Sequence, residues 1–258
     1  MAKKWGKFPH AEKAYVYDPA GLKKNWARLH KGDNEPYPKD AGVLEAWRHY
    51  HAGEFQQAVD AGRAAGSEGI NAAVKAQVIY ANYVEKAEAT RLALFEEAAG
   101  WADARRAAAP KDANTHYLYA FALGRYGQGI SVAKALAQGY GGKIKSGLTT
   151  ALKLDPRHAE AATAFGAYQT EVIAKVGGIV AGMTYGAKKD SALEHFEKAL
   201  KLFPESPIAH IEYANGLMLL FGKAKVDEAT KIYEKAAALK PMDAMERLDV
   251  ELAKSELE

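Results

Sequence analysis

Cysteine is absent from the 258-residue chain, and so is any long hydrophobic run. The lack of cysteine excludes a disulfide framework, a thiol nucleophile and a zinc–thiolate or iron–sulfur site. The longest apolar stretch, residues 172–185, is interrupted by Lys175 and by glycines. It is far shorter than the roughly 20 apolar residues of a spanning helix, so we predict no membrane span. The basic amino terminus lacks a following apolar segment, which predicts no secretory signal and a cytoplasmic location, or a periplasmic one if a signal was removed.

A large excess of one charge is also missing. The chain contains 35 lysines and arginines and 32 aspartates and glutamates, which gives a net charge of +3. The attraction to phosphates would be weak at this charge, so no nucleic-acid partner is predicted. The eight histidines include no His-Glu-x-x-His pair, and the glycine-rich segments lack the spacing of a phosphate-binding loop. A Gly-x-Ser-x-Gly nucleophile motif is missing too. The sequence therefore indicates no metal, no cofactor and no enzymatic activity.

Alanine is abundant instead, at 52 residues, and it is the residue that most favours helices. A spacing of small, aromatic and proline residues recurs as Ala192-x3-Phe196-x2-Ala199-x4-Pro204 and Ala229-x3-Tyr233-x2-Ala236-x4-Pro241. Weaker copies end at Pro110 and Pro156, and a bulky–small pair such as Phe165-Gly166 follows three of the prolines. This spacing places the residues on one face of a helix that the proline ends.

The arrangement resembles the tetratricopeptide repeat, in which the bulky–small pair lies on the first helix of a unit and the alanine–aromatic pattern on the second. The resemblance implies an all-α solenoid of antiparallel helix pairs with a concave binding surface. We assign residues 1–38, with four of the nine prolines, to an irregular N-terminal arm with one short helix, and residues 39–258 to the helical-repeat domain. Met245, Leu248 and Leu252 have helical spacing, which predicts a C-terminal capping helix.

Two insertions interrupt neighbouring repeats at the same point, over residues 124–142 and 171–187. They add 12 and 14 residues to the regular spacing, and together they hold ten of the 23 glycines. Glycine destabilises a helix by roughly 0.5–1 kcal/mol relative to alanine, so these glycines indicate a special role. We predict that the insertions pack against each other as extra helical turns and expose Tyr126, Tyr140, Lys175 and Tyr185 around a shared pocket.

The doubled insertion, with Asp155-Pro156-x-His158-x-Glu160 between its copies, resembles two groups of helical-repeat proteins. These groups are the periplasmic T-component of tripartite (TRAP) uptake systems and the eukaryotic regulators of microtubule dynamics. Resemblance to the T-component implies a transport-accessory or carrier protein that binds an apolar small ligand in a pocket lined by the insertions. The T-component is typically an exported lipoprotein, whereas this chain has neither a cysteine nor a predicted signal.

The predicted concave face is aromatic rather than polar. Some tetratricopeptide domains hold a partner's C-terminal carboxylate with asparagines on the first helix of each repeat, and only Asn215 fits that position here. Aromatic and aliphatic side chains suit an apolar helix, an extended peptide or a hydrophobic small ligand. A scaffold that binds a protein or peptide partner on this face is the main hypothesis, the carrier is its alternative, and an oligomer contact stays open. The candidate binding residues are Tyr117, Phe121, Arg125, Tyr126, Tyr140, Lys175, Val180, Tyr185, Ile211, Asn215 and Met218.

Overall fold

The computed structural model describes residues 5–258, apart from the side chains of Val132, Ala133 and Leu136; residues 1–4 of the predicted arm lie outside this range. The described chain is all-helical and contains no strand, which confirms the predicted fold class. In the same range, no helix combines the length and the apolar character that crossing a membrane requires.

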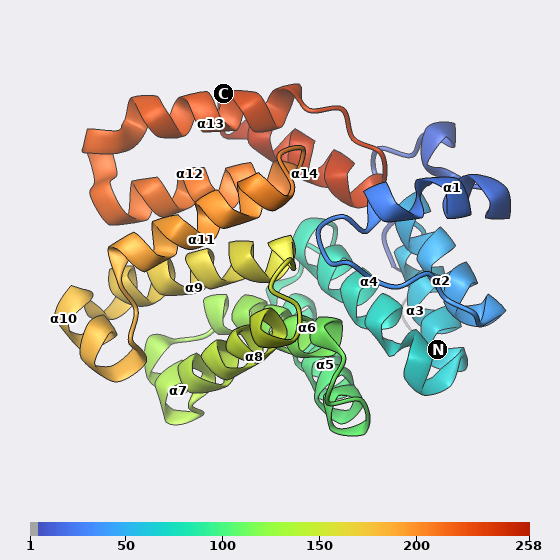
Figure 1. Ribbon diagram of the computed structural model, residues 1–258, viewed down its shortest axis with the longest axis horizontal. Helices are drawn as coiled ribbons and strands as arrows, with labels where there is room; N and C mark the ends of the chain where they lie inside the picture. Colours follow the sequence, from blue (N-terminus) through green and yellow to red (C-terminus); the bar gives the residue numbers. More distant parts are fainter. Residues whose placement is uncertain (1–4) are drawn as a thin grey trace.

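The helices follow one another in pairs. The first part of the chain forms η1 (Lys13–Tyr15), α1 (Pro19–Leu29), α2 (Ala41–Ala52), α3 (Phe55–Ala64), η2 (Gly66–Gly69), α4 (Ile70–Tyr83), α5 (Glu88–Ala108) and α6 (Ala113–Gln128). The second part forms α7 (Val132–Ala137), α8 (Tyr140–Leu154), α9 (Ala159–Val176), α10 (Gly178–Val180), η3 (Ala181–Tyr185), α11 (Lys189–Leu202), α12 (Pro207–Phe221), η4 (Gly222–Lys225), α13 (Val226–Ala238) and α14 (Ala244–Ser255). The pairs α2–α3, α4–α5, α6–α8, α9–α11 and α12–α13 are arranged in an arc (Figure 1).

The repeat prolines separate one helix from the next. Helices α5, α8, α11 and α13 end two or three residues before Pro110, Pro156, Pro204 and Pro241. Two residues after these prolines stand Asp112, His158, Ser206 and Asp243, and each side chain accepts a hydrogen bond from a backbone N–H of the next helix. Proline cannot continue a helix, and the N-cap acceptor satisfies a free N–H of the first turn. At four places, therefore, a proline ends one helix and the N-cap residue two positions later begins the next.

Glycine permits the tightest contact between pairs. Phe196 of α11 is completely buried, and its ring lies between Gly166 of α9 and Gly216 of α12. A Cβ atom at Gly166 would lie 2.7 Å from Cε1 of this ring, and one at Gly216 would lie 2.6 Å from Cε2. Both distances are well below van der Waals contact. The two glycines thus allow three helices to share one aromatic ring.

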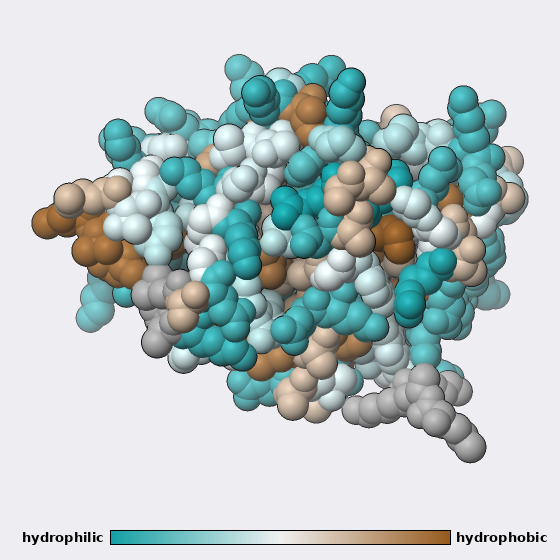
Figure 2. Space-filling model, turned by 90° about the horizontal axis from the view of Figure 1, so that it is seen from below, coloured by the Kyte–Doolittle hydropathy of each residue, from teal (hydrophilic) through white to brown (hydrophobic). Residues whose placement is uncertain are grey.

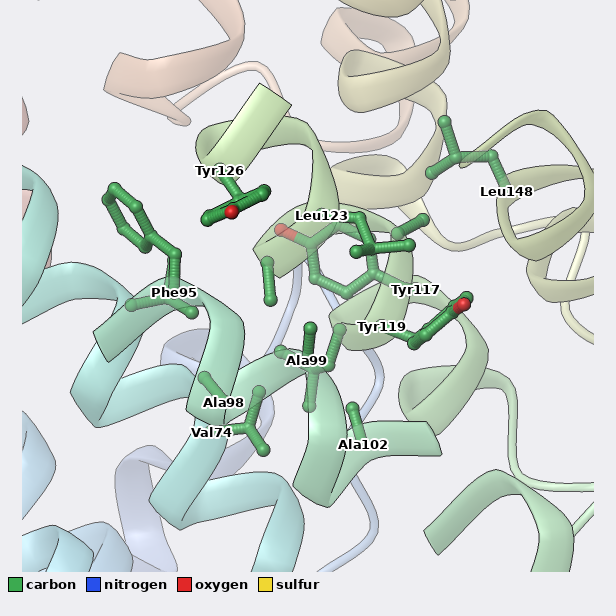
Figure 3. Close-up of a cluster of buried hydrophobic side chains, with 14 of the residues drawn as sticks. Val74, Phe95, Ala98, Ala99, Ala102, Tyr117, Tyr119, Leu123, Tyr126 and Leu148 are labelled. Carbon is green, nitrogen blue, oxygen red and sulfur yellow. The ribbon is translucent and has the colours of Figure 1, made fainter. Parts of the chain in front are cut away.

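The middle of the arc is filled by a hydrophobic cluster from α4, α5, α6 and α8 (Figure 3). Val74, Phe95 and Leu123 contribute to it from three different helices. Alanines line the side of α5 that faces α4 and α6, where their small side chains allow the helix backbones to approach closely. The abundance of alanine in the sequence is explained by this packing.

The two ends of the chain share a second cluster. Phe8 and Trp26 of the N-terminal arm are buried in it together with Leu248 of α14. Arg28 of α1 forms an ion pair with Glu246 of α14, with 2.6 Å between Nη1 and Oε1. Helix α14 therefore has two roles. It covers the last helix pair, α12–α13, and it also packs against the N-terminal arm (Figure 1).

As predicted, the insertions contact each other. The first comprises the end of α6, α7 and the start of α8, and the second comprises the end of α9, α10 and the single π-helical turn η3. A Cβ atom at Gly141 would lie 2.7 Å from the ring of Tyr185. The ring of one insertion therefore packs directly on the glycine backbone of the other.

The change Gly166→Ala is expected to lower the free energy of unfolding by about 1–3 kcal/mol, because the added methyl group would overpack the Phe196 ring. Gly100→Ala is the matched control, since Gly100 lies within α5 and a Cβ there would meet nothing within 4 Å. That variant should gain about 0.5–1 kcal/mol. Urea unfolding measures both, and equal stabilities would contradict the role of Gly166 in the contact.

Candidate functional site

A partly open cavity of about 180 Å³ lies on the concave side of the arc. Its lining residues come from α4, α6, α7, α8, α9, α12, α14 and η3, so its shape depends on helices from several pairs of the arc. The walls are mainly apolar and aromatic. The rings of Tyr117 and Phe121 on α6 stack with their centroids 5.7 Å apart. A concave, largely apolar cavity with a few polar groups is the usual form of a small-molecule site.

Six of the eleven predicted binding residues line this cavity. They are Tyr117, Phe121 and Arg125 from α6, Tyr140 from α8, Lys175 from α9 and Tyr185 from η3. The structure thus brings residues of the predicted concave face together with residues of both insertions. Residues of the two surfaces that the sequence suggested separately thus line one cavity.

Three of the remaining predicted residues are used within the fold. Tyr126 is buried in the central hydrophobic cluster. Ile211 is buried with Ala253, because α14 covers this part of α12. The Oδ1 atom of Asn215 accepts a hydrogen bond from the hydroxyl of Tyr233 on α13. The tertiary arrangement therefore places these side chains away from the cavity.

The last two lie on the outer surface. Val180 belongs to an apolar tip formed by α10 and η3, in which Ile179 is 81% and Met183 is 84% exposed. Figure 2 shows this hydrophobic tip projecting at the end of the molecule where Figure 1 places α10. Met218 is partly exposed on α12 and does not line the cavity.

Lys75 forms the polar floor of the cavity. This lysine of α4 is 3% exposed, and its Nζ atom lies 2.6 Å from Oδ2 of Asp33 and 2.9 Å from Oε1 of Glu160. Burial alone would raise the pKa of Asp33, but Lys75 and His30 hold it well below its usual range. Burial raises the pKa of Glu160 despite the opposing effect of Lys75. The sequence analysis did not identify Lys75, although it is the one charged residue of α4 and its position there could have indicated this group.

Two histidines extend the network to α14. His30 Nδ1 lies 3.0 Å from Oδ1 of Asp33, and His51 Nδ1 lies 2.8 Å from Oδ2 of Asp243. The two Nε2 atoms face each other at 3.2 Å. Because both Nδ1–H groups are directed at carboxylates, one of the Nε2 atoms has to carry a proton for this contact to be a hydrogen bond. The network thus joins the arm, α2, α4, α9 and the N-cap of α14.

Further charged groups line the walls of the cavity. Arg125 Nη2 lies 3.0 Å from Oε1 of Glu212, and Lys175 Nζ lies 3.3 Å from Oε2 of Glu171. Asp249 of α14 accepts a hydrogen bond at Oδ1 from the hydroxyl of Tyr83. The sequence analysis did not identify Asp249, although it stands four residues after Met245 and therefore on the apolar stripe of the predicted capping helix.

The described lining includes no histidine, serine or cysteine, so it contains no Ser–His or Cys–His pair of the kind used in nucleophilic catalysis. Across residues 5–258, no group of three or more histidines, aspartates or glutamates is arranged to hold a metal ion. What the site offers is aromatic surface with a small number of buried charges.

Comparison with known proteins supports the repeat architecture. A family model described as regulator of microtubule dynamics protein 1-3 matches residues 63–258. The crystal structure of a thermophilic TPR protein from Thermus thermophilus superimposes with a TM-score of 0.58 at 18% identity, over 83% of this chain and 97% of that chain. At this identity the likeness shows the fold alone. No curated protein matches the sequence.

Replacement of Lys75 by methionine is expected to lower the free energy of unfolding by about 3–5 kcal/mol, because Asp33 and Glu160 would stay buried without a cation. Lys31→Met is the control, since Lys31 and Glu205 form an exposed pair and such pairs contribute at most about 1 kcal/mol. Urea unfolding at neutral pH measures both losses. Similar losses in the two variants would show that the buried network is not a main source of stability.

His158 predicts a pH dependence of stability. It is buried as a neutral ring, since Nδ1 accepts from the N–H of Ala161 and Nε2 lies 2.8 Å from Oδ1 of Asn114. Burial lowers the pKa of His158 from 6.5 to about 4. Between these two values the unfolded chain binds a proton that the folded chain does not, so folded-state stability falls as the pH falls.

The variant His158→Asn, which keeps an N-cap side chain, should lack this contribution. From pH 6.5 to pH 4, the parent is expected to lose stability faster than the variant, by up to about 1.4 kcal/mol for each pH unit. Urea unfolding of both proteins at several pH values gives the two slopes. Identical slopes would contradict the assignment.

Proposed function

The chain belongs to the regulator of microtubule dynamics protein 1-3 family, and we propose that it is a non-catalytic binding protein that takes a small, mainly apolar ligand into the cavity on its concave face. The single observation behind this proposal is the partly open cavity of about 180 Å³ with its apolar and aromatic walls. An apolar cavity of about 150 Å³ in another protein holds benzene. A cavity of this size therefore has room for a small aromatic or aliphatic molecule.

The insertions support the same proposal. Tyr140, Lys175 and Tyr185 extend the aromatic wall that Tyr117 and Phe121 begin. Regular helix pairs would lack this part of the wall. A transport-accessory role, which the resemblance to the TRAP T-component implied, would use such a ligand site and stays a prediction.

A second candidate function is binding of a protein partner at the apolar tip. Isolated exposed apolar residues are ordinary, but here Ile179, Val180 and Met183 are clustered on one short projecting segment. Clustered exposed apolar side chains commonly mark interaction sites. The sequence analysis expected a protein or peptide partner on the concave face. We keep the expectation of such a partner and propose that it binds at this tip.

The ligand proposal is tested by filling the cavity. Gly124 of α6 lines it, and a Cβ atom there would meet nothing within 4 Å. Gly124→Leu should therefore fold normally and bind a neutral aromatic probe, 2-phenylethanol, at least tenfold more weakly than the parent in calorimetric titration. Gly100→Leu adds the same side chain to an exposed helix position and should bind like the parent.

The variant Val180→Asp separates the two candidate functions. Because Val180 is half exposed at the tip, this change should leave binding of 2-phenylethanol intact while weakening capture of a protein partner. Native mass spectrometry of the purified parent tests for a copurified small molecule. A parent that binds no neutral probe and carries no such molecule would overturn the ligand proposal.

A further inference from the structure

One wall of the cavity carries a carboxylate without a counter-charge. Asp249 is 1% exposed and lines the cavity from α14. Its Oδ1 atom accepts the hydrogen bond from Tyr83, whereas its Oδ2 atom is buried and has no hydrogen-bond partner within residues 5–258. A buried carboxylate oxygen of this kind is unfavourable unless something else in the site satisfies it.

The charges around the cavity do not balance. The described lining contains four carboxylates, on Glu160, Glu171, Glu212 and Asp249, and three cations, on Lys75, Arg125 and Lys175. Every one of these three cations already forms an ion pair with a carboxylate other than Asp249. An ionised Asp249 would therefore have no cation of the lining to pair with. Burial, together with the negative charges of Asp243, Glu246 and Glu160, raises the pKa of Asp249 well above its usual range.

The neighbouring walls also favour a positive charge. Tyr83, Tyr117 and Phe121 line the same cavity, and the faces of aromatic rings attract cations. The hydroxyl oxygen of Tyr117, which lines the cavity, can accept a hydrogen bond from a donor such as an ammonium group. An anionic ligand would meet acceptors and negative charge here, whereas a protonated amine would meet complementary groups.

We propose that the ligand of this cavity is a small amphipathic amine, whose single ammonium group binds Oδ2 of Asp249 while its apolar or aromatic body occupies the space beside Tyr117 and Phe121. This inference rests on the proposed ligand-binding function and adds the chemical class of the ligand. The ammonium group supplies the hydrogen-bond donor that Oδ2 lacks and the positive charge that the lining lacks. Charge-assisted hydrogen bonds are stronger than neutral ones, so the amine should be preferred over an uncharged analogue.

The test uses three probes that share a phenyl ring and differ in charge. Phenethylamine is cationic at neutral pH, 2-phenylethanol is uncharged, and 3-phenylpropionate is anionic. Calorimetric titration of the full chain should show phenethylamine binding at least tenfold more tightly than 2-phenylethanol, and 3-phenylpropionate binding most weakly. Asp249→Asn should reduce the preference for the amine to within about twofold and leave the affinity for the alcohol unchanged.

The control variant is Glu251→Gln, which removes a carboxylate from the same helix at a more exposed position beside Arg247 and Lys254. It should keep the tenfold preference. A parent that binds 2-phenylethanol as tightly as phenethylamine would overturn the amine proposal and leave the ligand-binding function standing. A parent that binds none of the three probes would overturn both. Retention of the preference in Asp249→Asn would show that another group recognises the amine.

A second measurement does not depend on the variant. The ¹³C chemical shift of the Asp249 carboxyl reports its ionisation in the parent protein. Addition of phenethylamine should move this shift to the ionised value, because a bound cation stabilises the carboxylate. Addition of 2-phenylethanol should leave it unchanged. Equal shifts with both probes would contradict the contact between the ammonium group and Asp249.

Discussion

The buried ion pairs of Lys75 are the interaction on which the rest of the structure depends. The lysine stands on α4, and its two carboxylate partners come from the N-terminal arm and from α9. A buried charge is strongly unfavourable without its partners, so each of these segments is needed to stabilise the others. Through His30 and His51 the same network reaches Asp243 at the start of α14. This network therefore connects the N-terminal arm with helices α2, α4, α9 and α14.

Closure of the arc turns an open concave surface into a cavity. The floor consists of the charged groups that hold the arc together, and the walls consist of aromatic side chains from α6 and from the insertions. Asp249 differs from the other charged groups of the lining because the described part of the chain leaves one of its oxygens without a partner. Lys75 is central to the stability of the fold, whereas the proposed contact with an amine uses Asp249.

Much of the architecture could be predicted from the sequence because it depends on local physics. Pro110, Pro156, Pro204 and Pro241 end helices wherever they occur, since proline lacks the N–H and its ring excludes the helical conformation of the preceding turn. The fixed spacing of bulky and small residues identified Phe196 and Gly166 as repeat positions, and the structure shows that these two residues contact each other. Six of the eleven predicted binding residues line the cavity, and three of these, Tyr140, Lys175 and Tyr185, were predicted from the two insertions.

The remaining features were decided by the tertiary structure. His51 and Asp243 are 192 residues apart in the chain, and no periodicity relates them, because their contact depends on the curvature accumulated over every helix pair between them. The same curvature brings α14 over α12, which buries Ile211 with Ala253. The sequence by itself determined where helices begin and end and which faces are apolar, since these follow from interactions within a few residues. The sequence could not show which apolar faces would form the core and which would line the cavity. That outcome depends on the contacts between the two ends of the arc.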